Sequence, residues 1–182
     1  MPHGGSAPSP WILRFLPQIS LEGAVLDVAC GDGRHVRALL AKGRRVVGVD
    51  RDVSGLADLA GRSELEIVAA DLEDGSPWPL PPERRFVAVV VANYLHRPLS
   101  PVLTGALAEG GLLLYETFAV GNERFGRPSN PDFLLRPGEL LEIAVAGGLN
   151  VIAYEHGLMG DPPRAVVQRL CAVRGARLTA IA

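Results

Sequence analysis

An apolar run passes directly into a glycine-rich turn at Ala24-Val25-Leu26-Asp27-Val28-Ala29-Cys30-Gly31-Asp32-Gly33. The run predicts a buried strand over 24–28, and the pattern after it predicts a helix over 34–42 that ends at Gly43. A strand, a tight glycine turn and a helix in this order are typical of the first unit of an open α/β sheet, where the turn faces a ligand. This stretch therefore predicts both a fold class and the place of a site.

The same alternation continues on the carboxyl side of this unit. Further strands are expected over 45–50, 65–70, 86–92 and 112–116, with helices over 54–59 and 101–108. The run 86–92 is nearly all valine and alanine, which indicates a strand buried on both faces of a parallel sheet. A helix over 137–146 and two last strands over 150–155 and 165–173 complete the pattern. We predict an α/β, doubly wound, Rossmann-like fold, with a mostly parallel seven-stranded sheet, an antiparallel C-terminal hairpin and helices on both faces.

The chain of 182 residues is long enough for one domain with a sizeable core, and we expect residues 1–182 to form a single domain. Residues 1–20 are expected to be a loose N-terminus followed by a short capping helix that carries Trp11 and Phe15. That helix either packs on the body or covers a ligand. Residues 119–136 follow neither a helical nor a strand period, and so long an irregular stretch predicts a lid over an acceptor pocket.

The composition excludes several classes of protein. With 18 Lys and Arg against 20 Asp and Glu, the net charge of −2 disfavours a protein that coats nucleic acid or an anionic membrane. Hydrophobic residues make up 48%, so disorder is not expected. No apolar run reaches the roughly 18 residues that span a bilayer, and the start of the chain does not resemble a signal peptide. We expect a cytoplasmic protein with no membrane partner.

Other residues are given structural roles. Cys30 and Cys171 match neither a disulfide scaffold nor a metal-ligand spacing, so no metal site is predicted and Cys30 is taken as a packed residue. His35 is interpreted as a solvated or capping residue, and Arg44-Arg45 as part of a solvated face.

Polar residues follow several of the predicted strands at the point where each strand ends. Asp50, Asp71 and Asn93-Tyr94 come at the ends of the second, third and fourth strands. The carboxyl ends of parallel strands share one edge of a sheet, so these side chains are expected to lie together. Asp50 suits a ribose diol, because a carboxylate accepts hydrogen bonds from both hydroxyls. Val36 stands where a dinucleotide fingerprint would have glycine or alanine, although a nicotinamide-dependent oxidoreductase stays open as an alternative.

Taken in order, the motifs resemble those of class I S-adenosylmethionine (SAM)-dependent methyltransferases, and the resemblance covers about residues 21–175. The segments that carry it are Leu26-Asp27-Val28-Ala29-Cys30-Gly31-Asp32-Gly33, Val47-Gly48-Val49-Asp50, Ala70-Asp71-Leu72, Val91-Ala92-Asn93-Tyr94 and Gly110-Gly111-Leu112-Leu113. The segment from Glu116-Thr117-Phe118 to Phe133 resembles a bacterial subgroup of small methyltransferases related to tellurite-resistance proteins.

This resemblance implies SAM as the cofactor. It implies that Asp27 and the Gly31/Gly33 turn hold the methionine end, that Asp50 takes the ribose hydroxyls, and that Asp71 takes the adenine amino group near the Leu72 backbone. Asn93 would lie under the sulfonium. Ala29 stands where the family usually has glycine. The implied cofactor-binding residues are Asp27, Ala29, Gly31, Gly33, Asp50, Arg51, Asp71, Leu72 and Asn93.

Tyr94 and His96 follow the fourth strand, where the family places residues that face the methyl group, and they are the predicted catalytic residues. A neutral imidazole is well matched to taking a proton from an acceptor near neutral pH. The alternative is that His96 caps the turn before Pro98. We predict methyl transfer to a small-molecule acceptor and expect no nucleic-acid substrate. An RNA or protein methyltransferase that works with a partner, and a SAM-binding protein without turnover, remain alternatives.

Overall fold

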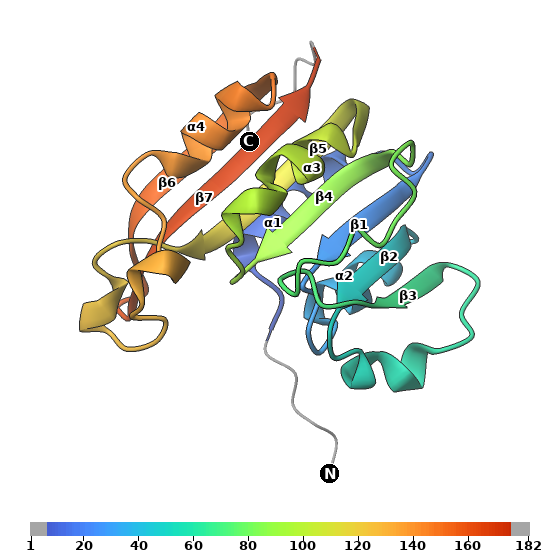
Figure 1. The fold of residues 1–182 in the computed structure, drawn as a ribbon, viewed down its shortest axis with the longest axis horizontal. Helices are drawn as coiled ribbons and strands as arrows, with labels where there is room; N and C mark the ends of the chain where they lie inside the picture. The colour runs from blue at the N-terminus through green and yellow to red at the C-terminus, as the bar shows by residue number, and fades with distance from the viewer. Residues whose placement is uncertain (1–6, 176–182) are drawn as a thin grey trace.

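The apolar runs of the sequence form one sheet at the centre of the molecule (Figure 1). The computed structural model describes residues 7–175. The sheet has seven strands in the order β3-β2-β1-β4-β5-β7-β6. The strands are β1 (Ala24–Val28), β2 (Arg45–Asp50), β3 (Leu65–Ala69), β4 (Phe86–Ala92), β5 (Leu107–Phe118), β6 (Leu149–Met159) and β7 (Ala165–Arg174).

Pairing within this sheet is parallel from β3 through β5, whereas β7 is antiparallel to both β5 and β6. Helices cover both faces of the sheet, with α3 and α4 on one face and α1 and α2 on the other (Figure 1). The helical elements are α1 (Pro10–Phe15), η1 (Leu16–Gln18), α2 (Arg34–Leu40), η2 (Ser54–Leu59), η3 (Arg97–Leu99), α3 (Ser100–Gly105), η4 (Asn122–Arg124), η5 (Pro131–Phe133) and α4 (Glu139–Ala146). The predicted fold class is confirmed.

The path of the chain creates a crevice in the sheet. From β1 the chain builds outward through β2 to β3, and it then returns to place β4 on the other side of β1. Ligands of open α/β sheets bind where the strand order reverses in this way, outside the carboxyl ends of the strands. The glycine turn after β1 and the Asn93-Tyr94 segment after β4 flank that point. No helix within residues 7–175 is long and apolar enough to cross a membrane.

The short N-terminal helix α1 packs on the sheet. Trp11 and Phe15 are buried against it, and the Trp11 indole Nε1–H donates to the Leu170 carbonyl oxygen at 3.2 Å. No described residue of α1 lines either of the two cavities described below, which favours the packing role over the ligand-covering role. The loose start predicted for the chain falls partly on residues 1–6, which lie outside the described residues.

Three of the predicted helices have different bounds. The helix expected over 34–42 ends at Leu40. The helix expected over 101–108 ends at Gly105, and β5 begins at Leu107. The β4–β5 register shifts between Phe86 and Ala88, so β5 is irregular between Leu107 and Leu112. Within this part, a Cβ added at Gly111 would lie 2.9 Å from the Phe86 carbonyl oxygen. The helix expected from Pro137 begins at Glu139, because Gly138 adopts a φ of 78° just before it.

The segment 119–136, predicted to be irregular, is an ordered loop whose two ends pair with each other. Ala119 bridges Leu135, and the loop contains the short turns η4 and η5. Inside it, Asn122 is only 1% exposed. Its amide donates to the Pro128 carbonyl at 3.0 Å, and its side-chain oxygen accepts from the Val166 N–H at 3.2 Å. One buried amide thus ties the loop to β7.

Candidate functional site

A cavity of about 380 Å³ opens at the carboxyl ends of the parallel strands. It brings together six of the predicted site residues and adds Ala70, Glu73 and Phe133, which were not among the predicted site residues. The complete lining is Ala29, Asp50, Arg51, Ala70, Asp71, Leu72, Glu73, Tyr94 and Phe133. A larger cavity of about 560 Å³ lies between α3 and α4, and it contains none of the predicted site residues.

The Asp50 carboxylate connects the end of β2 to the glycine turn. Its Oδ2 accepts the Gly31 N–H at 2.7 Å, and its Oδ1 accepts the Asp52 N–H at 3.0 Å. Each carboxylate oxygen has further lone pairs for a ligand. Gly31 itself has a φ of 52°, and a Cβ added there would have no atom within 4 Å, so the turn faces open space.

Backbone strain collects at the same edge of the sheet. Ala29 (φ 52°) and Asn93 (φ 57°) are the non-glycine residues with positive φ in the described part of the chain, and they follow β1 and β4. Such a conformation costs on the order of 1–3 kcal/mol and is concentrated at functional sites. Ala29, which replaces the family glycine, therefore still adopts the left-handed conformation that favours glycine. Asn93 is exposed and does not line the cavity.

Asp27 lies beneath the glycine turn and is almost completely buried. Burial raises the pKa of Asp27 to about 7, against the opposing effects of the Arg34 charge and the Val36 N–H. Its Oδ2 has no hydrogen-bond partner among the described residues. A buried acceptor without a partner is costly, so this oxygen suits a ligand donor or a bound water.

Both the backbone conformation and the packing at Gly33 require glycine. It has a φ of 75°, and an added Cβ would lie 2.1 Å from Leu56 Cδ2. It is also the N-cap of α2, and its carbonyl accepts the Arg37 N–H at 2.9 Å. The turn thus combines one glycine that faces open space, Gly31, with one that packing requires, Gly33.

Tyr94 and Phe133 form the aromatic part of the cavity wall. The Tyr94 hydroxyl is buried without a hydrogen-bond partner among the described residues, and burial, reinforced by the nearby Glu73 charge, raises the pKa of Tyr94 above its usual range. Phe133 comes from η5 in the loop 119–136 and is 46% exposed. Phe133 belongs to the segment predicted as a lid, but the sequence does not single it out from its neighbours, because it reaches the cavity only through the path of that loop.

His96 is half-buried and lines neither cavity. Its backbone carbonyl accepts the Leu99 N–H at 3.1 Å, and its side chain makes no capping hydrogen bond. The capping alternative for His96 therefore applies to its backbone and not to its imidazole. The catalytic role of the imidazole stays a prediction.

The structure corrects two other interpretations. His35 is buried, and its Nε2 accepts the Ser9 N–H at 3.1 Å, which holds the start of α1 against α2. Arg44 is 8% exposed, and its Nη2 donates to the Leu16 carbonyl oxygen at 3.3 Å, so it is not part of a solvated face. Cys30 is packed as expected, and burial raises the pKa of its thiol, as does the Asp27 charge.

Buried His35 makes the stability of the fold depend on pH. Burial and then the Arg34 charge lower the pKa of His35 from 6.5 to about 4. As the pH falls below 6.5, His35 of the unfolded chain gains a proton that the folded chain does not take up until about pH 4. The unfolding free energy therefore falls over this range. We expect wild type to lose about 2 kcal/mol more unfolding free energy between pH 7 and pH 5 than His35→Gln does. Urea titrations at both pH values measure the difference, and equal losses in the two proteins would contradict it.

Comparison with known proteins identifies the domain. A family model described as a methyltransferase domain matches residues 25–111, which contain the strands β1 to β4 and the turn after β1. Residues 25–111 form a methyltransferase domain. The prediction of a class I SAM-dependent methyltransferase is thereby confirmed. The likeness to the tellurite-resistance subgroup is one of fold.

Relatives and solved structures extend this result. The tRNA U34 carboxymethyltransferases of Shewanella woodyi and Shewanella loihica are 31% and 32% identical to the chain over 145 residues. Each match covers 66% of this chain, which spans only 42% of the relative's length. TehB from Haemophilus influenzae has the same fold, with a TM-score of 0.73 at 17% identity over 95% of this chain and 64% of that one.

A further structure of the same fold carries a bound SAM product. The 1,6-didemethyltoxoflavin-N1-methyltransferase of Burkholderia thailandensis, solved with 1,6-didemethyltoxoflavin and S-adenosylhomocysteine (SAH), matches with a TM-score of 0.68. It is 19% identical and covers 92% of this chain and 77% of that one. SAM is the methyl donor of this family, so the oxidoreductase alternative is set aside.

Proposed function

We propose that this methyltransferase domain transfers a methyl group from SAM to a small-molecule acceptor. The observation that carries the proposal is that one cavity, beside the switch point of the sheet, gathers Ala29, Asp50, Asp71 and Tyr94. When bound, SAM supplies an electrophilic methyl group on its sulfonium, so the protein needs no nucleophile of its own.

The residues at this edge of the sheet fit SAM. Asp27 offers a buried oxygen without a partner for the cationic methionine end, and Gly31 opens the turn beside it. Asp50 would accept the ribose hydroxyls, and Asp71, with the Leu72 backbone, would bind the adenine amino group. Carboxylates are the stronger class of acceptor for such donors. Arg51 and Ala29 would complete the wall, with Asn93 under the sulfonium.

The chain's own residues have three tasks in this proposal. The strand ends orient the donor, since displacement needs the acceptor atom about 3 Å from the methyl carbon. Tyr94 and Phe133 exclude water from the mouth of the cavity, which strengthens the polar contacts inside. Tyr94 also offers a buried hydroxyl to the acceptor, and His96 would take a proton from it where the acceptor must lose one.

The charge around the cofactor cavity supports a small acceptor over a nucleic acid. The charged lining residues of the cavity are Asp50, Asp71 and Glu73 against Arg51. An acidic rim disfavours a phosphate backbone, because nucleic-acid affinity comes mainly from neutralised phosphates.

A tRNA acceptor is the second candidate, and one observation favours it: the 31% identical relatives are tRNA U34 carboxymethyltransferases. They are also more than twice as long as the part that this chain spans.

One labelling experiment separates the two acceptors. The purified protein is incubated with SAM carrying a radioactive methyl group, once with a cell extract passed through a 1 kDa filter and once with bulk tRNA. We expect label in the low-mass fraction and none in acid-precipitable RNA. Label in the tRNA alone would reverse the order of the two candidates, and label in neither, with no SAM binding, would contradict the proposed function.

A variant of His96 tests the general base. We expect His96→Ala to bind SAM normally but to methylate an amine, hydroxyl or thiol acceptor about 10²-fold more slowly. The loss should shrink as the pH rises, because the acceptor then deprotonates by itself. Rates and SAM affinity measured between pH 6 and 9 check this result, with the exposed His156→Ala as a matched control. Unchanged rates across that range would remove the base and leave positioning alone.

A further inference from the structure

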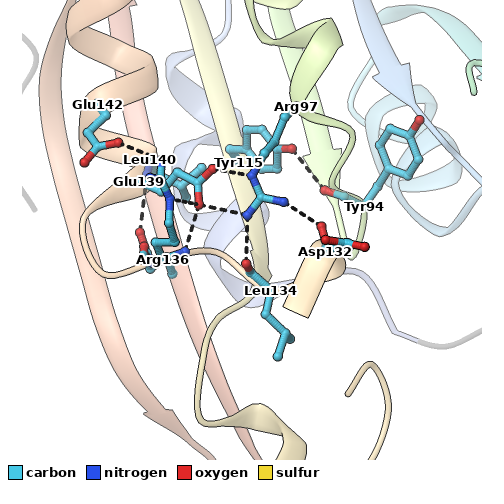
Figure 2. A network of polar contacts seen from close by, with 10 residues as sticks. Tyr94, Arg97, Tyr115, Asp132, Leu134, Arg136, Glu139, Leu140 and Glu142 are labelled. Atoms are coloured by element: carbon cyan, nitrogen blue, oxygen red, sulfur yellow. Dashed lines mark hydrogen bonds and ion pairs between the residues drawn. The ribbon is translucent and has the colours of Figure 1, made fainter. Parts of the chain in front are cut away.

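Arg97, which no predicted role included, lies just beyond β4 and contacts two distant segments (Figure 2). Its Nε and Nη2 donate to the two carboxylate oxygens of Glu139 in α4, at 2.7 and 3.0 Å. Its Nη1 donates to the Asp132 carbonyl at 2.6 Å, and Nη2 also donates to the Leu134 carbonyl at 2.9 Å. One guanidinium thus uses its planar fork on a carboxylate and on the backbone of the loop 119–136.

The carboxylate that holds Arg97 is itself fixed. Glu139 is almost completely buried, and its Oε2 also accepts the Arg136 N–H at 2.8 Å. Burial acts to raise the pKa of Glu139, but its bonds to Arg97 and to the Arg136 N–H outweigh burial, and the pKa lies below its usual range. A buried, ionised and fully bonded carboxylate keeps the guanidinium in one orientation.

The two carbonyls that Arg97 binds flank Phe133, the residue by which the loop reaches the cavity. The opposite part of the cavity wall is held in a similar way, since the Tyr115 hydroxyl donates to the Tyr94 carbonyl at 3.0 Å. Arg97 and Tyr115 therefore fix the backbones of the two aromatic residues at the mouth of the cavity, and both belong to the same network in Figure 2.

We infer that Arg97 is a positioning residue that holds Phe133 over the cofactor cavity, with Glu139 as its anchor. This inference rests on the proposed function for its consequence, because Phe133 would then cover bound SAM or SAH. The latch itself, defined as Arg97 with Glu139 and the Asp132 and Leu134 carbonyls, is a property of the protein without ligand.

A double-mutant cycle tests whether Arg97 acts through Phe133. We expect Arg97→Ala and Phe133→Ala each to weaken SAH binding about 10-fold, and the double variant to lose no more than either one, because both changes remove the same cover. Calorimetry measures the affinities. A loss of about 100-fold in the double variant, the product of two independent effects, would overturn the inference, as would normal binding by Phe133→Ala.

Conservative variants distinguish the hydrogen-bond geometry of the Arg97 guanidinium from its positive charge. Arg97→Lys keeps the charge opposite Glu139 but cannot reach both carbonyls, so we expect it to bind SAH as weakly as Arg97→Ala. If the residue only neutralised Glu139, lysine would restore binding, and the inference would be wrong. Arg84→Ala is the matched control, because Arg84 makes a similar two-bond pair with Glu66 far from the loop. If Arg97→Ala does not fold, Glu139→Gln replaces it in these measurements, because it removes the charge that holds Arg97 and keeps Arg97 itself.

Proteolysis tests the latch without any ligand. Trypsin can cut the exposed loop at Arg124, whereas Arg127 and Arg136 each precede a proline. We expect Arg97→Ala and Arg97→Lys to be cut at Arg124 at least 5-fold faster than wild type and Arg84→Ala, because the loop opens more often. Equal cutting would overturn the latch. If wild type binds no SAH but the Arg97 variants are still cut faster than wild type, only the proposed function is contradicted.

Discussion

Asp50→Ala is expected to bind SAM at least 100-fold more weakly than wild type. In the proposed complex its carboxylate accepts the two ribose hydroxyls, and each such bond to a charged group contributes roughly 1.5–3 kcal/mol. The substitution also removes the acceptor of the Gly31 N–H at 2.7 Å and of the Asp52 N–H at 3.0 Å, so the turn loses its link to β2. Two lost bonds of this kind correspond to a 10²- to 10⁴-fold change in dissociation constant.

The affinity is measured by calorimetry, with circular dichroism to establish that the variant is folded. Asp58→Ala is the matched control, because Asp58 is an exposed carboxylate on η2 that pairs with Arg37 and does not line the cavity. We expect the control to bind SAM as wild type does. A folded Asp50→Ala protein with wild-type affinity would remove Asp50 from the ribose site.

Gly33→Val is expected to destabilise the fold by about 3–5 kcal/mol. A β-branched residue at a φ of 75° is strained, which costs on the order of 1–3 kcal/mol. The new Cβ would also lie 2.1 Å from Leu56 Cδ2, and overpacking of a core adds roughly 1–3 kcal/mol. Loss of SAM binding would follow from the damaged start of α2 and not from a blocked ligand. Urea titration measures the unfolding free energy.

Two variants separate the parts of this cost. Gly31→Ala introduces a side chain at a φ of 52° where no atom lies within 4 Å, so we expect a loss of only about 1 kcal/mol. Adding Leu56→Ala to Gly33→Val should remove the overlap and leave the backbone strain. Leu56→Ala should therefore lower the unfolding free energy less in the Gly33→Val protein than in wild type. A Gly33→Val protein as stable as Gly31→Ala would show that the turn relaxes around the new side chain.

The sequence by itself predicted seven strands, the doubly wound fold and the edge of the sheet at which the candidate site lies. Hydrophobic runs such as 86–92 are local signals, because burial on both faces of a parallel sheet selects continuous apolar residues. Strand-end residues such as Asp50 and Asp71 also needed only local information, since parallel strands bring their carboxyl ends to one edge. The cofactor class followed from the resemblance of these motifs to those of class I SAM-dependent methyltransferases.

Only the tertiary structure decided which residue of the predicted lid reaches the cavity and how the buried groups around it are paired. Arg97 meets Glu139 across 42 positions, and Ser9 meets His35 across 26. Neither pair has a period or a spacing that marks it, because each depends on where separate elements pack. Phe133 reaches the cavity only because Asn122 and Arg97 hold its loop against β7 and α4. The pKa of Asp27 is likewise set by burial beneath the turn, an environment that exists only after the sheet and α2 have assembled.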